Sequence, residues 1–300
     1  MTAQRRTVRI GDPAPDFSLP SLAGEQVHLS DFRGKRALFF IWAPWELCRD
    51  QLSGWEAFYQ KRKQEKFELV SVAVDAWGAK RVRPFVESAR PSFKTLIDTT
   101  EAVWDLYGFE LIPSGYYVDE SSHVRYLKVG GFDVRDMTTV KIVEDLLAEK
   151  WSKKPIKPVE RPYSSLRQEM ADLVRQLKSS TRGVDKHLRL ADLMVQSGHL
   201  RKAAREYDAV LAQHPRNIKA LFGRGVLFAR EGKKESALTC WRRALALAPT
   251  NWIIHKQIWA LESPEQFYPK INYFWQQEQT RREEFLASAE QKVKAKAQRK

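Results

Sequence analysis

The stretch FFIWAPWELCRD, residues Phe39–Asp50, decides the fold of this chain. It continues an apolar run that begins at Arg36, breaks at Pro44 and then reaches a tryptophan and a single cysteine, Cys48. Nearly continuous apolar runs of this length are typical of strands that helices cover on both faces. The stretch therefore predicts a buried strand that stops at the proline and leads into a helix starting near Cys48.

Residues 1–150 alternate between strand-like and helix-like patterns, which indicates an α/β domain. The predicted strands are Arg36–Ala43, Phe67–Asp75, Phe93–Asp98, Gly115–Glu120 and His123–Val129, and the predicted helices are Cys48–Lys66, Gly78–Arg90, Thr100–Tyr107 and Met137–Glu149. Only two serines separate the last two strands, which favours an antiparallel hairpin. The segment DFSLPSLAGEQVHLSDF predicts a further hairpin near the N-terminus.

Three local motifs in this half carry a family resemblance. They are the opening APDFSLPSLAGEQVHLSDFRGK, the segment WAPWELCR, and LIPSGYYVD with Pro113 after Ile112. Together they resemble thioredoxin-like redoxins of the TlpA/ResA and AhpC/TSA type over about residues 10–150. The resemblance implies a thioredoxin-like fold, a cis-proline at Pro113, and a polypeptide-binding edge that includes Trp45, Ile112 and Pro113.

The redox motif departs from that family. The family pattern is W-C-x-x-C-R, whereas this chain reads Trp45-Glu46-Leu47-Cys48-Arg49. Aligned from the tryptophan, Glu46 replaces the nucleophilic cysteine; aligned from the Cys–Arg pair, Cys48 takes the place of the second cysteine. Dithiol exchange needs one thiolate to attack and a second thiol to resolve the mixed disulfide. The other cysteine, Cys240, belongs to a different domain, so dithiol–disulfide exchange by this chain alone is not expected.

Two interpretations of Cys48 stay open. At the first turn of a helix, the helix dipole and Arg49 would favour a thiolate that glutathione or a separate thioredoxin could regenerate. Glu46 and Asp50 oppose this by placing carboxylates nearby. In the alternative, Cys48 is a half-buried apolar residue without redox chemistry, and Glu46 only supplies negative charge to the helix N-terminus.

Residues 163–285 carry helical periodicity throughout and contain an internal repeat. Pro215 and Pro249 end two copies 34 residues apart, which agree in phase at the small and aromatic positions, such as Ala203 with Ala237 and Tyr207 with Trp241. These copies resemble tetratricopeptide repeats (TPRs), which implies an all-α solenoid. The range Trp252–Glu262 is predicted to begin a third repeat, and the residues after it to cap the array.

Charge and composition distinguish the remaining segments. Residues 1–150 hold 21 Lys and Arg against 22 Asp and Glu, whereas residues 151–300 hold 30 against 15. Residues 151–162, rich in proline and lysine, are predicted to be a linker, and the basic residues 286–300 a disordered tail. The TPR groove is expected to bind a client or partner protein that offers acidic side chains or a C-terminal carboxylate, and the candidate cations for it are Arg189, Lys219, Arg224, Arg230 and Lys256. Charge alone does not predict nucleic-acid binding.

Several function classes lack their sequence signals. The chain has no P-loop or Gly-rich nucleotide fingerprint, and its six histidines show no metal-ligand spacing, so neither a cofactor nor a metal is expected. No run of 18 apolar residues predicts a membrane span. The absence of a secretory signal and the presence of only two cysteines favour the reducing cytoplasm.

The sequence therefore supports three hypotheses. The first is a bacterial protein of the redox-homeostasis or chaperone-like type that acts mainly through protein binding, with at most monothiol chemistry at Cys48. The second is a thiol-dependent peroxidase or oxidoreductase that uses Cys48 with an external thiol. The third is a structural scaffold in which Cys48 has no chemical role.

Overall fold

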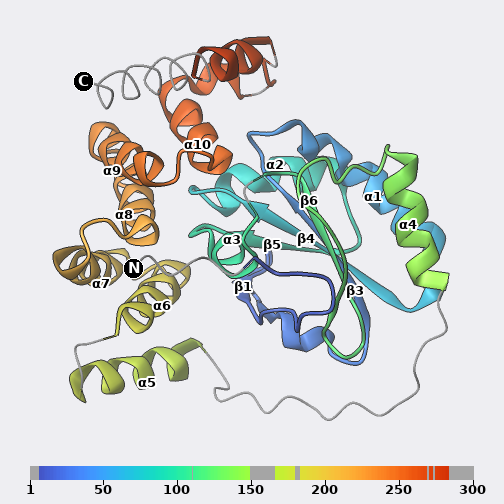
Figure 1. Cartoon of the computed structure of the whole chain (residues 1–300), viewed down its shortest axis with the longest axis horizontal. Helices are drawn as coiled ribbons and strands as arrows, with labels where there is room; N and C mark the ends of the chain where they lie inside the picture. Colours follow the sequence, from blue (N-terminus) through green and yellow to red (C-terminus); the bar gives the residue numbers. More distant parts are fainter. Residues whose placement is uncertain are drawn as a thin grey trace, which may run out of the picture.

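The computed structural model describes residues 7–109, 111–148, 166–179, 183–268, 270–272 and 274–283. The predicted linker 151–162 and tail 286–300 lie outside this range. Figure 1 shows a mixed β-sheet with helices on both faces, followed by a region built of helices alone. The predicted combination of an α/β thioredoxin-like domain and an all-α TPR domain is confirmed.

The central sheet has five strands in the order β5-β4-β3-β6-β7. Strands β3, β4 and β5 are mutually parallel, and β6 and β7 form the predicted antiparallel hairpin. The bounds are β3 (Arg36–Trp42), β4 (Phe67–Val74), β5 (Lys94–Asp98), β6 (Ser114–Val118) and β7 (Val124–Lys128). The N-terminal hairpin of β1 (Ser18–Pro20) and β2 (Gln26–His28) forms a separate two-stranded sheet.

Strand β3 is buried along its whole length because both faces of the sheet are covered. Leu38 and Phe40 point to the face covered by α1 (Leu52–Arg62), α2 (Ala79–Ala89) and α4 (Met137–Ala148). Phe39 and Ile41 point to the opposite face, which packs against α3 (Ala102–Tyr107), the N-terminal hairpin and the C-terminal helices. This alternation follows from the two-residue period of a strand.

The predicted helix Cys48–Lys66 is wrong at its start. A 3₁₀ helix, η2 (Leu47–Gln51), precedes α1, and a second one, η3 (Lys63–Glu65), ends it. Short 3₁₀ turns are common at helix ends and have poorer hydrogen-bond geometry than an α-helix. Cys48 therefore does not lie in the first turn of the α-helix, which weakens the argument that a helix dipole activates its thiol.

The C-terminal half is an array of antiparallel helices. Its members are α5 (Leu166–Ser179), α6 (Val184–Gln196), α7 (Leu200–Gln213), α8 (Ile218–Arg230), α9 (Lys234–Leu247) and α10 (Trp252–Glu262). Glycines set the close approach of α8 to its neighbours: a Cβ on Gly223 would lie 2.3 Å from Tyr207, and one on Gly225 would lie 2.2 Å from Trp241. The two repeats are thus α6–α7 and α8–α9, and α10 follows them as a helix; that α10 begins a third repeat stays a prediction.

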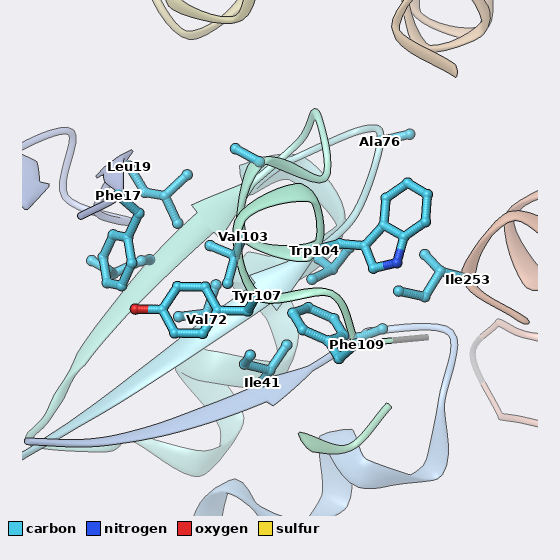
Figure 2. Close-up of a cluster of buried hydrophobic side chains, with 14 of the residues drawn as sticks. Phe17, Leu19, Ile41, Val72, Ala76, Val103, Trp104, Tyr107, Phe109 and Ile253 are labelled. Carbon is cyan, nitrogen blue, oxygen red and sulfur yellow. The ribbon is translucent and has the colours of Figure 1, made fainter. Parts of the chain in front are cut away.

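The repeats pack directly on the α/β domain. In Figure 1, α6, α8 and α10 lie on the side of the array that faces the sheet, while α7 and α9 lie outside. Trp241 meets Trp77 edge to face at a centroid distance of 6.0 Å, and Arg230 Nε donates to the carbonyl oxygen of Ala76 at 2.9 Å. Figure 2 shows the indole of Trp104 directed at Ile253 of α10 inside one buried apolar cluster. The two domains therefore share a hydrophobic core.

Candidate functional site

The motif loop after β3 lies beside the Ile112–Pro113 peptide, which is cis as predicted. Trp45 and Glu46 from this loop and Leu111 and Ile112 from the proline loop form one wall of a pocket of about 210 Å³. The opposite wall comes from the C-terminal domain and consists of Trp252, Ile253 and Lys256 of α10 together with Thr280. The edge that was expected to bind polypeptides thus faces a helix of the same chain across the pocket.

Cys48 does not line this pocket. Its side chain is 1% exposed and belongs to the apolar cluster on the α1 face of the sheet, together with Trp42 and Leu52. Trp45, three residues earlier, belongs to the cluster on the other face. Burial raises the pKa of the Cys48 thiol to about 12, and backbone hydrogen bonds only partly oppose that shift. The geometry favours the interpretation of Cys48 as a packed, protonated thiol.

Arg49 fixes the motif loop rather than activating the thiol. Its guanidinium is buried and lies over the ring of Phe85, 4.6 Å from the centroid. Its Nη1 donates to the carbonyl oxygens of Pro44 at 2.8 Å and Phe267 at 3.1 Å. Since Phe267 follows η4 (Pro264–Gln266) in the C-terminal domain, Arg49 links the redox-motif position to the end of the repeats.

Glu46 makes the second link between the domains. It is 8% exposed, and its carboxylate forms an ion pair with the ammonium group of Lys256. Burial lowers the pKa of Lys256 to about 8. From the sequence Lys256 was only a candidate cation for the groove, because no local signal could pair residues 210 positions apart.

The other cations expected in the TPR groove also have partners within the chain. Arg189 Nε pairs with Glu169 of α5 at 2.7 Å, and Arg224 Nε pairs with Asp208 of α7 at 2.7 Å.

Lys219 Nζ lies 3.0 Å from Asp105 of α3 and 2.9 Å from Asp192 of α6. Burial disfavours its charged form, but the two carboxylates outweigh this effect and raise the pKa of Lys219. The structure thus places Lys219 in the domain interface instead of on an open surface.

Comparison with known proteins agrees with this fold. Residues 10–127 match the model of the AhpC/TSA family, and residues 188–251 match a tetratricopeptide repeat model. The thioredoxin-like protein YneN of Bacillus subtilis is 32% identical over 133 residues, covering 43% of this chain and 77% of that protein. The chain belongs to the AhpC/TSA family of thioredoxin-like proteins.

Other relatives carry oxidoreductase names. The thiol-disulfide oxidoreductase ResA of Geobacillus kaustophilus is 27% identical over 135 residues, covering 45% of this chain and 77% of ResA. A crystal structure of a putative thiol:disulfide interchange protein DsbE from Chlorobium tepidum matches with 28% identity and a TM-score of 0.43, covering 47% of this chain and 98% of that one. By the family match and the sequence relatives, the α/β half is a redoxin domain homologous to thiol-disulfide oxidoreductases, and the helical half is of a repeat type associated with protein–protein interaction.

The part of the chain that the structure describes contains neither a metal-binding cluster nor a membrane-spanning helix. Within it, no three His, Cys, Asp or Glu side chains are grouped so that they could hold a metal ion. None of its helices is both long enough and apolar enough to cross a membrane.

Proposed function

We propose that this redoxin acts by binding another protein and not by dithiol exchange. The observation that carries the proposal is the position of α10 over the motif loop: Trp45 and Glu46 are buried, and α10 faces them and Ile112 across the pocket. Arg49 and Glu46 hold this arrangement in place through Phe267 and Lys256. An extended polypeptide would have to displace this part of the repeat domain before it reached the motif loop.

The chemistry of Cys48 supports the same conclusion. With a pKa of about 12, about one thiol in 10⁵ would be ionised at pH 7. The thiolate is the attacking species in disulfide exchange, and a buried thiol is also inaccessible to a protein disulfide. Cys240 on α9 is only partly buried, but burial raises its pKa as well. The relatives' oxidoreductase activity therefore does not extend to this chain by its own thiols.

The partner protein binds the outer helices in this proposal. The inward helices α6, α8 and α10 are occupied by the redoxin domain, whereas α7 and α9 face outward (Figure 1). Helix α7 carries three exposed cations, Arg201, Lys202 and Arg205. Helix α9 also carries exposed cations, but they bond within the chain: Lys234 and Arg242 contact Glu262, and Arg243 donates to the carbonyl oxygen of Pro215. Because charge complementarity governs encounter and specificity, the partner is an acidic protein.

Two assays test this function. The first measures reduction of a protein disulfide and turnover of a hydroperoxide, each with glutathione or thioredoxin supplied, for the wild type and for Cys48→Ser. We expect no turnover above the uncatalysed rate in either protein. Turnover that disappears in Cys48→Ser would overturn the proposal and support the thiol-dependent peroxidase instead.

The second assay identifies the partner surface by crosslinking. A variant with Arg201→Glu, Lys202→Glu and Arg205→Glu on α7 is compared with a control that reverses three exposed cations of the redoxin domain, Lys80 and Arg83 on α2 and Lys61 on α1. Crosslinks to an acidic protein should disappear in the α7 variant and persist in the control variant. Crosslinks that persist in the α7 variant would place the partner elsewhere.

A further inference from the structure

Two adjoining cavities lie between the motif loop, α10 and the helix at residues 274–283. The first is the pocket of about 210 Å³ described above, and the second, of about 310 Å³, is lined by Lys256, Gln276, Gln277, Thr280 and Arg281. They share two lining residues, Lys256 and Thr280, which stand at their junction. We infer that the two together form a binding site for a small carboxylate that carries an apolar body.

The first cavity suits the apolar body. Five of its lining residues are Trp45, Leu111, Ile112, Trp252 and Ile253, which are aromatic or aliphatic. The Glu46 and Lys256 charges that also reach it neutralise each other as an ion pair. Apolar pockets with a few converging polar groups are the usual form of small-molecule sites.

The second cavity contains an unsatisfied amide. Gln276 is 2% exposed, and neither its Nε2 nor its Oε1 has a hydrogen-bond partner among the residues that the structure describes. Buried polar groups in proteins are nearly always hydrogen-bonded, so an amide without a partner in a cavity wall points to a polar group that binds there. The Gln276 amide would donate to one oxygen of that group.

The charge of the second cavity favours an anion. Arg281 is exposed at its rim and pairs with no carboxylate within the described ranges. The neighbouring Glu283 is engaged, because it accepts from Trp259 Nε1 at 2.8 Å and forms an ion pair with His255. With the Lys256 charge balanced by Glu46, Arg281 supplies the net positive charge, and a guanidinium matches the two oxygens of a carboxylate. Among the described residues that line the two cavities, Arg281 is the cation without a carboxylate partner, and one such cation beside an apolar wall selects a monocarboxylate.

The experiment measures binding by isothermal titration calorimetry on the full chain. The probes are two carboxylates, octanoate and 4-phenylbutyrate. The controls are 1-octanol and octylamine, which have an eight-carbon chain like octanoate but a neutral and a positively charged head group. We expect one site per chain for both carboxylates, and binding of the alcohol and the amine at least 10-fold weaker.

Matched variants locate the site. Arg281→Gln should weaken carboxylate binding about 5- to 10-fold, while Arg282→Gln, an exposed neighbour outside the cavity lining, should leave it unchanged. Trp252→Leu should weaken both carboxylates without changing the preference for them over the amine. Far-ultraviolet circular dichroism on each variant establishes that it is folded.

Three results would overturn the inference: no binding of either carboxylate, equal binding of octylamine, or equal effects of Arg281→Gln and Arg282→Gln. The site is independent of the proposed partner surface on α7 and of Cys48. The crosslinking and turnover assays can therefore overturn the proposed function while carboxylate binding is still observed. Equally, carboxylate binding can be absent while those assays support the proposed function.

Discussion

Lys256 of α10 forms a buried ion pair with Glu46, the residue that follows the motif tryptophan. A family redoxin carries its attacking thiol at this position when the motifs are aligned from the tryptophan. Here the position holds a carboxylate whose partner is supplied by the repeat domain, 210 residues away. The replacement therefore turns the position of a reactive group into a contact between two domains.

Lys256→Met should destabilise the protein by about 3 kcal/mol, because it leaves the buried Glu46 carboxylate without its ammonium partner. The double variant Glu46→Gln/Lys256→Met should recover most of this loss, since a neutral amide and an apolar side chain replace the two charges together. Urea unfolding of the two single variants and the double variant measures the coupling. Additive losses would show that the two side chains do not interact in solution.

Cys48 should resist alkylation in the folded protein. Because burial excludes the reagent and raises the pKa of the thiol to about 12, iodoacetamide should modify Cys48 at least 100-fold more slowly at pH 8 than in 6 M urea. Peptide mass spectrometry distinguishes Cys48 from Cys240, which is less buried and serves as the internal reference. A folded-state labelling profile with an apparent pKa well below the ordinary cysteine value of about 8.5 would instead identify Cys48 as an activated monothiol.

The two domains should unfold in one cooperative transition, because the apolar cluster on one face of the sheet continues into α8 and α10. Trp77→Ala removes the edge-to-face contact with Trp241 and should lower the free energy of unfolding by about 2 kcal/mol. Phe274→Ala is the control, since that ring is 68% exposed and its removal should change stability by less than about 0.5 kcal/mol. Two separate transitions in the wild type would contradict a shared core.

The free energy of unfolding should fall as the pH rises from 4.5 to 7.5. Burial raises the pKa of both Asp75 and Asp98 to about 6, so the folded state keeps protons that the unfolded chain releases near pH 4. Their contribution is therefore fully present below about pH 4 and is lost as the pH rises through 6, by about 1–3 kcal/mol for each group.

Asp75→Asn tests the origin of this pH dependence. The amide oxygen can still accept the hydrogen bond from the backbone N–H of Trp77, now 2.8 Å from Oδ1, but the group no longer titrates. Urea unfolding at four pH values should show a flatter profile for Asp75→Asn than for the wild type. An unchanged profile would assign the pH dependence to other groups.

Much of the fold followed from local patterns. The continuous apolar run of β3 predicted a strand covered on both faces, and the burial of Leu38 and Phe39 on opposite faces explains that run. The close approach of Gly225 to Trp241 is the physical reason for a small residue at that repeat position. The start of α1 was predicted less well, because a 3₁₀ turn and the first turn of an α-helix have the same sequence signals.

The sequence alone determined that the first thiol of the redox motif is absent and that a redoxin domain is followed by tetratricopeptide repeats. Both statements depend on residue identity and spacing, which the sequence contains completely. Only the tertiary structure decided that Glu46 pairs with Lys256, that Cys48 is buried away from the pocket, and that Lys219 joins α8 to α3. These outcomes depend on how the two domains dock. Residues that pair across 100 to 210 positions cannot be recognised from the sequence, because the pattern of apolar residues in each segment reports only the local helix or strand.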